Sequence, residues 1–148
     1  MRIIFGADHS GVTLKKALLA LAKRLGHSVT DVGTDSTLSV DYADFARTVG
    51  LAIQQGTADR GVLICRTGIG MSIAANKIDG VRAAVAYHPE VVMLSRQHND
   101  ANVLCFGADF VSLPRARRYL KIWLATEFSG EERHRRRVQK IQAMEQNP

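Results

Sequence analysis

The chain has 148 residues, which predicts a single domain, 1–148, large enough to bury a core of its own. Hydrophobic residues make up 46% of it and charged residues 23%, a composition that excludes a disordered or fibrous chain. The net charge of +6 suits nucleic acid or phosphorylated ligands, although much of it comes from one C-terminal cluster: Arg133, Arg135, Arg136, Arg137 and Lys140.

The predicted strands and helices alternate along most of the chain. In chain order they are a strand over 1–7, a helix over 11–25, a strand over 27–32, a helix over 41–55, a strand over 60–65, a helix over 71–77, a strand over 81–86, a helix over 89–97, a strand over 102–106 and a helix over 114–126. Five strands joined by helical crossovers predict an α/β fold with a doubly wound, five-stranded parallel sheet of the Rossmann-like kind. An extra C-terminal helix over 131–145 has no strand to cover, so we expect it to pack on a partner chain.

Apolar runs and cysteines indicate the compartment. No apolar run approaches the roughly 20 residues that a membrane-spanning helix needs. The two cysteines, Cys65 and Cys105, do not form a disulfide framework in a chain of this size. We therefore expect no membrane partner and a reducing, cytoplasmic location. Cys105 lies inside an apolar strand and is predicted to be a core residue.

Ligands of such sheets bind outside the carboxyl ends of the strands, so the residues that follow each strand are candidates for a site. The first strand is followed by Asp8 and His9, and the third by a glycine-rich run, 67–72, that leads into a helix. Glycines let the backbone approach a ligand, and free N–H groups at a helix start face an anion, so this run predicts an anion-binding loop. It matches neither the dinucleotide fingerprint nor the P-loop, and no histidine or cysteine pair has the spacing of a metal site. We therefore expect no cofactor and no metal.

Three further patterns each allow two interpretations. Cys65 ends a buried strand, as a small core residue does, but the glycine-rich loop beside it could stabilise a reactive thiolate. His98 and Asn99 lie on a loop before the fifth strand, either as a turn or as part of a site. Arg133 and Arg137 share one helix face, where they either are solvated or converge on one phosphate. The joint presence of anion loop, candidate base and arginines favours chemistry on a phosphosugar.

Several motifs together resemble the ribose-5-phosphate isomerase B family, the group that also holds allose-6-phosphate and galactose-6-phosphate isomerases. The resemblance runs from end to end and rests on 5–11 (FGADHSG), Asp41-Tyr42, the Cys65 loop, 72–77 (SIAANK), 95–100 (SRQHND), Arg133-His134 and Arg137-Val138. It implies an aldose–ketose isomerase of a small sugar phosphate that forms homodimers, or dimers of dimers, with sites between subunits. Nucleic acid is disfavoured as a partner because the basic cluster lacks the aromatic residues that stack on bases.

The resemblance also implies a role for each candidate residue. Cys65 is the base that moves a proton from C2 to C1, Thr67 exchanges protons with the substrate oxygens, and His98 opens the furanose ring. Backbone amides of the loop stabilise the enediolate, which is commonly the largest catalytic contribution: these are the amides of Thr67, Gly68, Ile69 and Gly70. The other residues hold the substrate: Asp8 the sugar, His9, Arg133 and Arg137 the phosphate, with Tyr42 and Asn99 lining the pocket.

Arg66 departs from the family pattern, in which glycine usually follows the cysteine. Its place between Cys65 and Thr67 favours an orientation into the pocket, where it would bind substrate, and the alternation of side chains along a strand end allows the opposite one. The sequence therefore allows more than one sugar phosphate as the substrate. Ribose 5-phosphate is the leading substrate, with allose 6-phosphate, galactose 6-phosphate or a tetrulose phosphate as alternatives. A sugar-phosphate-binding protein without turnover is a further alternative.

Overall fold

The computed structural model describes residues 1–145, and the last three residues of the predicted domain, 146–148, lie outside the described residues. The strands are β1 (Arg2–Ala7), β2 (Ser28–Asp31), β3 (Arg60–Cys65), β4 (Ala83–Val85) and β5 (Val103–Gly107). The helices are α1 (Val12–Arg24), α2 (Tyr42–Gln54), α3 (Ile69–Ala75), α4 (Pro89–Asn99), α5 (Leu113–Ala125) and α6 (Glu132–Met144). They alternate in the predicted order, and α6 is the expected extra helix at the C-terminal end.

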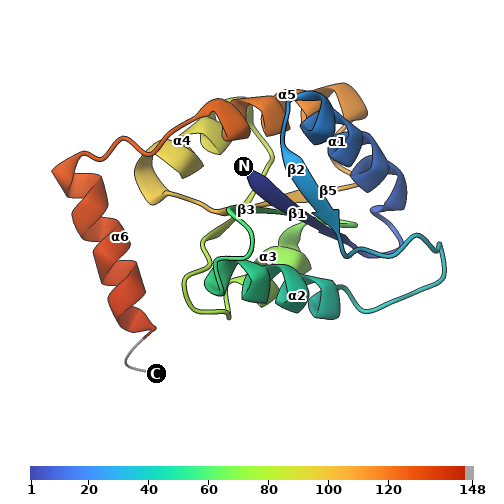
Figure 1. Cartoon of the computed structure of the whole chain (residues 1–148), viewed down its shortest axis with the longest axis horizontal. Helices are drawn as coiled ribbons and strands as arrows, with labels where there is room; N and C mark the ends of the chain where they lie inside the picture. The colour runs from blue at the N-terminus through green and yellow to red at the C-terminus, as the bar shows by residue number, and fades with distance from the viewer. Residues whose placement is uncertain (146–148) are drawn as a thin grey trace.

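The strands form one parallel sheet in the order β2-β1-β3-β5-β4, which confirms the predicted doubly wound α/β fold. Helices α1, α4 and α5 cover one face of the sheet, and α2 and α3 cover the other (Figure 1). The crossovers that run toward β2 contain α1 and α4, whereas those that run toward β4 contain α2 and α3. Because such crossovers are right-handed, opposite directions place the helices on opposite faces.

Alternating side chains along the strands divide the core into two layers. Phe5 and Phe106 belong to the layer under α1 and α5, together with Trp123 of α5. Cys65 and Cys105 belong to the layer under α2 and α3. Cys105 is fully buried there, so its prediction as a core residue is confirmed.

Two predicted helix boundaries are wrong in a way that affects the site. Helix α4 extends to Asn99, so His98 and Asn99 lie in its last turn and not on a loop. The helix continues because Arg96 pairs with Asp100 one turn later, with 2.7 Å between Nη1 and Oδ1, and Asp100 ends it in a left-handed conformation. Helix α3 begins at residue 69, earlier than predicted, because Gly68 turns the chain at φ 78° just before it.

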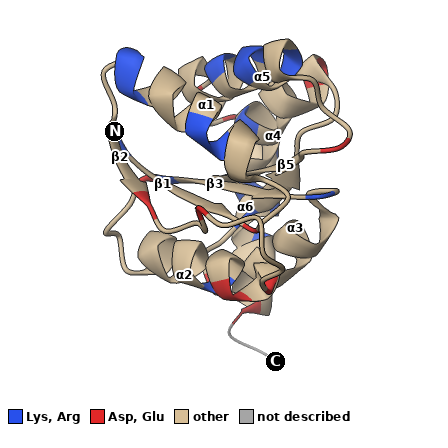
Figure 2. Ribbon diagram, turned by 90° about the vertical axis from the view of Figure 1, so that its right-hand side faces the viewer, with Lys and Arg blue, Asp and Glu red and all other residues tan. Residues whose placement is uncertain are grey.

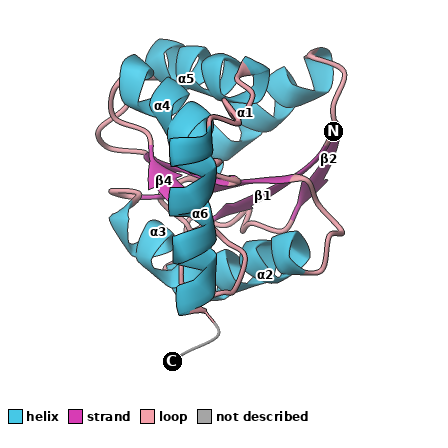
Figure 3. Ribbon diagram, turned by 90° about the vertical axis from the view of Figure 1, so that its left-hand side faces the viewer, coloured by secondary structure: helices cyan, strands magenta, loops and turns pink. Residues whose placement is uncertain are grey.

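Helix α6 stands apart from the two helical layers. It contacts α4 and crosses the edge of the sheet at which the strands begin (Figures 1 and 3). The C-terminal end of α6 is held near the start of β4, where the Gly80 N–H donates to Glu145 Oε1 at 2.9 Å. No helix within residues 1–145 is both long and apolar enough to span a membrane.

Candidate active site

One group of predicted site residues meets at the carboxyl edge of the sheet, between β1 and β3. Asp8 and His9 follow β1, and the segment from Arg66 to Gly68 follows β3. From β1 the chain continues to β2 on one side, and from β3 it continues to β4 on the other, which makes this place a topological switch point. Switch points of parallel sheets open a crevice that holds ligands.

Cys65 is the last residue of β3 at this switch point. Its side chain is only 4% exposed, and its Sγ accepts a hydrogen bond from the Gly68 N–H at 3.2 Å. Thr67 Oγ1 accepts from the Ile69 N–H at 3.2 Å, and the amide of Gly70 lies in the first turn of α3, where amides lack an intrahelical acceptor. The loop therefore presents N–H groups beside the sulfur, an arrangement that stabilises negative charge on the thiolate or on a bound oxygen.

Two glycines of this loop are closely approached by neighbouring atoms. A Cβ on Gly68 would lie 3.0 Å from the Phe106 carbonyl carbon and 3.1 Å from the Gly107 nitrogen, both on the backbone of β5. A Cβ on Gly70 would lie 2.6 Å from Cζ of Tyr42, so the tyrosine ring packs directly on the loop. Tyr42 thus reaches the Cys65 loop from the start of α2, and its place in the substrate pocket stays a prediction.

Asp8 and His9 are held by their neighbours at the same edge. The buried Asp8 carboxylate accepts hydrogen bonds from the N–H and the hydroxyl of Ser10 through Oδ1. His9 Nδ1 accepts from the Val40 N–H at 3.2 Å, which leaves the proton of the neutral ring on Nε2. An N–H donor at Nε2 is what a phosphate oxygen requires.

Arg66 extends toward the loop after β5. Its Nε donates to Asp109 Oδ2 at 2.7 Å, and the side chain is 77% exposed. A contact between Arg66 and substrate stays a prediction. In Figure 2, which looks onto the carboxyl edge, the basic residues of α1 and α5 lie above the sheet, and the basic helix α6 lies behind it.

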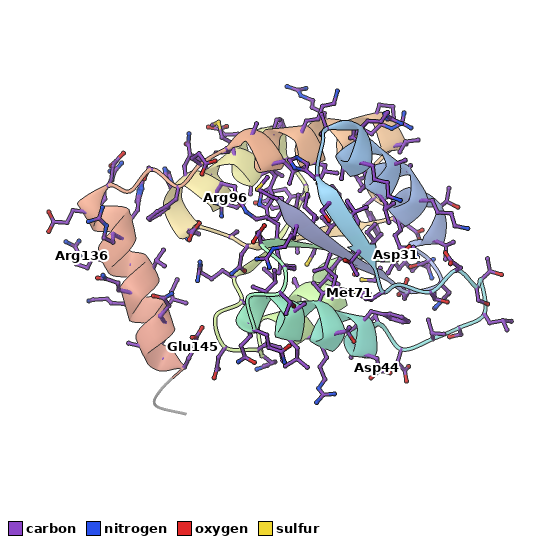
Figure 4. The ribbon with its side chains drawn as sticks, in the orientation of Figure 1. Asp31, Asp44, Met71, Arg96, Arg136 and Glu145 are labelled. Carbon is purple, nitrogen blue, oxygen red and sulfur yellow. The ribbon has the colours of Figure 1, made fainter. Side chains whose placement is uncertain are left out.

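The remaining predicted residues lie at the opposite edge of the sheet. Helix α4 runs back from the carboxyl edge, so His98 and Asn99 end up beside the start of β5, and Arg133 and Arg137 are exposed on the neighbouring α6. In Figure 4, Arg96 of α4 lies on the side of α6, whereas Asp31 at the carboxyl end of β2 lies on the other side.

The separation follows from the register of the sheet. The Gly61 N–H donates to the carbonyl of Asn102, which lies three residues after the end of α4 and just before β5, so Gly61 and Asn102 lie at the same height in the sheet. Gly61 and Cys65 are four residues apart on β3, which corresponds to about 13 Å along the strand. One chain therefore does not bring His98, Asn99, Arg133 or Arg137 to its own Cys65.

One buried polar residue beside this second group was missed by sequence reasoning. His134 of α6 is 2% exposed, and its ring centroid lies 4.0 Å from that of His98. The signal was its spacing, because residues 134, 138 and 141 share one face of α6 and Val138 and Ile141 are apolar. The second cysteine, in contrast, lacks polar contacts of this kind: burial, with a smaller contribution from Cys65, raises the pKa of the Cys105 thiol.

Comparisons with known proteins show which family the chain resembles. A sequence model described as Ribose/Galactose Isomerase matches residues 3–141. Ribose-5-phosphate isomerase B of Escherichia coli (strain K12) is 46% identical over 145 residues, covering 98% of this chain and 97% of that protein. The D-erythrulose-4-phosphate isomerase of Pectobacterium atrosepticum is 37% identical over 131 residues, covering 88% and 86% of the two chains.

Solved structures extend the similarity to the whole fold. Ribose-5-phosphate isomerase B of Clostridium thermocellum superposes with a TM-score of 0.96 at 45% identity, covering 99% of this chain and 98% of that one. The Mycoplasma genitalium enzyme with bound ribulose-5-phosphate superposes with a TM-score of 0.95 at 37% identity, covering 99% and 97%. From fold, site and comparisons together, the chain belongs to the ribose/galactose isomerase family.

Proposed function

We propose that this chain interconverts ribose 5-phosphate and ribulose 5-phosphate, with Cys65 as the base, in a site that a second copy of the chain completes. The observation that carries the proposal is the buried Cys65 sulfur at the switch point, facing the amide of Gly68. The similarity to ribose-5-phosphate isomerases B, one of them with bound ribulose-5-phosphate, supports this substrate. The predicted cytoplasmic location fits this chemistry and stays a prediction.

The second copy is required by the separation of the two groups of residues. A twofold axis can place the α4 and α6 end of one chain against the Cys65 loop of its partner, and the same contact then repeats at a second, equivalent site. Exposed apolar side chains support a covering partner at this place. Ile69, Tyr87 and Phe110 are exposed and, with Thr67, line a hollow of about 420 Å³ beside the loop. We therefore expect a homodimer.

Ring opening is the first chemical step. His98 of the second copy gives a proton to the ring oxygen, the bond from C1 to that oxygen breaks, and the C1 hydroxyl releases its proton to water. The product is the open-chain aldehyde, with the carboxylate of Asp8 holding a sugar hydroxyl.

Isomerisation follows through an enediolate. The Cys65 thiolate takes the proton from C2, and the electron pair moves to form the C1–C2 double bond with negative charge on O1. Thr67 gives its hydroxyl proton to O1 and takes the proton of O2, after which the C2 carbonyl forms and Cys65 returns its proton to C1. Amide donors from residues 68–70 stabilise the charge where it develops.

Phosphate binding uses both chains. His9 offers Nε2–H from the carboxyl edge, and Arg133 and Arg137 of the second copy supply the positive charge. Arginine suits this task because its planar guanidinium can bind a phosphate through two parallel hydrogen bonds. Tyr42 and Asn99 line the space between phosphate and reacting carbons.

The direct test is the rate of conversion for a panel of sugar phosphates. We expect the highest kcat/KM with ribose 5-phosphate and lower values with allose 6-phosphate, galactose 6-phosphate and erythrulose 4-phosphate. The alternative of a different substrate has support in the D-erythrulose-4-phosphate isomerase among the relatives and in Arg66 beside the base. Turnover of another sugar phosphate at a higher kcat/KM would favour that alternative, and binding without any turnover would favour a non-catalytic protein.

A further inference from the structure

Two imidazole rings meet where α4 and α6 contact each other. The ring centroids of His98 and His134 are 4.0 Å apart, and the ring planes are tilted by 39°. His98 is half-buried at the end of α4, whereas His134 is almost completely buried on the face of α6 that points to the body of the molecule. A half-buried imidazole thus lies against an almost completely buried one.

His134 is fixed by the segment between α5 and α6. Its Nδ1 lies 2.8 Å from Ser129 Oγ, and the same oxygen accepts the Glu131 N–H at 3.3 Å. The Ser129 N–H donates to the carbonyl of Gln97, next to His98, at 3.1 Å. Ser129 therefore ties the His134 ring to the same helical turn that carries His98. With one hydrogen bond already donated to Ser129 Oγ, its own hydroxyl proton can go to Nδ1, which favours the Nε2–H tautomer.

Burial and most of the charges around His134 favour the neutral form of its ring. The groups that face it are His98 from α4 and, from α6 and the residue before it, Arg133, Arg137 and Glu131. Burial first, and then the nearby His98 and Arg133, lower the pKa of His134 below its usual value. A neutral ring adds no third positive charge beside the two phosphate-binding arginines, and its face can support a protonated His98 through a cation–π contact.

We propose that His134 is a positioning residue, whose buried ring holds the imidazole of His98 in the orientation from which it opens the sugar ring. The inference rests on the proposed ring opening by His98, and it assigns His134 no contact with substrate. Mispositioning of an acid by a fraction of an ångström slows proton transfer, since such catalysis depends on a hydrogen-bonded geometry. His134 acts on the first step alone, so a loss of its ring spares the later transfer between C2 and C1.

Two substitutions separate the ring face from the hydrogen bond. His134→Asn keeps a polar atom near the position of Nδ1 for Ser129 but removes the ring, and we expect kcat with ribose 5-phosphate to fall about tenfold. His134→Phe keeps an aromatic face against His98 and loses the hydrogen bond, and we expect it to restore kcat to within about threefold of wild type. Arg136→Gln is the control, because it removes one positive charge from the same helix. Arg136 is exposed on the outer side of α6 (Figure 4).

The decisive measurement compares a ring substrate with an open-chain one. Ribulose 5-phosphate cannot close a five-membered ring, because its C5 oxygen carries the phosphate, so exchange of its C1 proton with D2O needs Cys65 and no ring opening. We expect His134→Asn to keep this exchange within about twofold of wild type while it loses turnover of ribose 5-phosphate. Equal losses in both assays would overturn the positioning role and indicate that His134 is purely structural. Full activity of His134→Asn in both assays would also overturn the positioning role.

The same assays separate this inference from the proposed function. His98→Ala should lose turnover of ribose 5-phosphate and keep the exchange, whereas Cys65→Ala should lose both. If His98→Ala turns over ribose 5-phosphate at the wild-type rate, ring opening by His98 is wrong and the role of His134 is wrong with it. If His98→Ala behaves as expected and His134→Asn matches wild type, only the role of His134 is wrong.

Discussion

Gly68→Ala tests how the loop controls the base. Gly68 has a left-handed φ of 78°, and an added Cβ would lie 3.0 to 3.2 Å from three backbone atoms of Phe106 and Gly107. Those atoms belong to β5, a strand with neighbours on both sides, so the loop has to move instead. The movement lengthens the bond of 3.2 Å from the Gly68 N–H to Cys65 Sγ.

The magnitude follows from these two effects. An alanine at a positive φ costs about 1 kcal/mol, and the contact with β5 brings the expected loss of unfolding free energy to roughly 1–3 kcal/mol. A hydrogen bond to a charged group is worth about 1.5–3 kcal/mol, so losing it from the Cys65 thiolate should slow the thiolate reaction roughly 10- to 100-fold. We expect a drop of this size both in kcat and in the rate of Cys65 alkylation by iodoacetamide at pH 7.

Gly26→Ala is the matched control. Gly26 has a similar φ of 84°, with no atom within 4 Å of an added Cβ, so the substitution has the conformational cost without the movement of the loop. It should lower stability by about 1 kcal/mol and leave kcat and alkylation unchanged. Wild-type kcat and alkylation in Gly68→Ala would refute the role that we assign to the Gly68 amide.

Five further substitutions test the other parts of the site, one of them as a control in the core. Cys65→Ala should lower kcat by at least about 100-fold, as expected for a lost base, while Cys105→Ala in the core should keep the activity. Arg133→Ala and Arg137→Ala should each raise KM for ribose 5-phosphate roughly 10- to 100-fold, since a charge-assisted contact is worth about 1.5–3 kcal/mol. Arg66→Gly removes an exposed ion pair of about 0–1 kcal/mol, so stability should hardly change, and the ranking of sugar phosphates by kcat/KM reports whether Arg66 selects the substrate.

Each of these predictions has a result that would contradict it. More than about a tenth of wild-type kcat in Cys65→Ala would show that another group is the base. If KM is unchanged in both arginine variants, with Arg136→Gln as reference, Arg133 and Arg137 only form a solvated helix face and do not bind phosphate. An unchanged ranking in Arg66→Gly would make Arg66 a tolerated surface residue and remove its bearing on the choice of sugar.

The fold was largely predictable because its signals are local. Apolar runs of strand length alternate with helical spacing, and glycine or proline marks most boundaries, so the parallel doubly wound sheet followed from the sequence. The order of the strands in the sheet could not be predicted, because β4 and β5 are both apolar runs in the sequence. Packing decides which of them lies at the edge of the sheet. The structure puts β5 inside the sheet, fully buried, and the short, partly exposed β4 at its edge.

The site was predictable where a residue directly follows a strand. Asp8, His9 and Cys65 reach the carboxyl edge by this rule alone. The rule does not apply to His98, because a residue just before a strand lies at the amino edge of the sheet. His98 and Cys65 of one chain are therefore at opposite edges, so one chain cannot assemble the site. His134 was missed since its residue type suggested a polar surface, whereas its burial depends on the contact of α6 with α4.

The central claim is that the site is shared between two copies of the chain, and a mixed dimer tests it most directly. Cys65→Ala and His98→Ala chains with different affinity tags are expressed together, and the dimer that carries both tags is purified. If the site is shared, one of its two sites contains both lesions and the other none, so turnover of ribose 5-phosphate should return to about half of wild type. If each chain builds its own site, every site keeps a lesion, and the mixed dimer would be as inactive as the two parent variants.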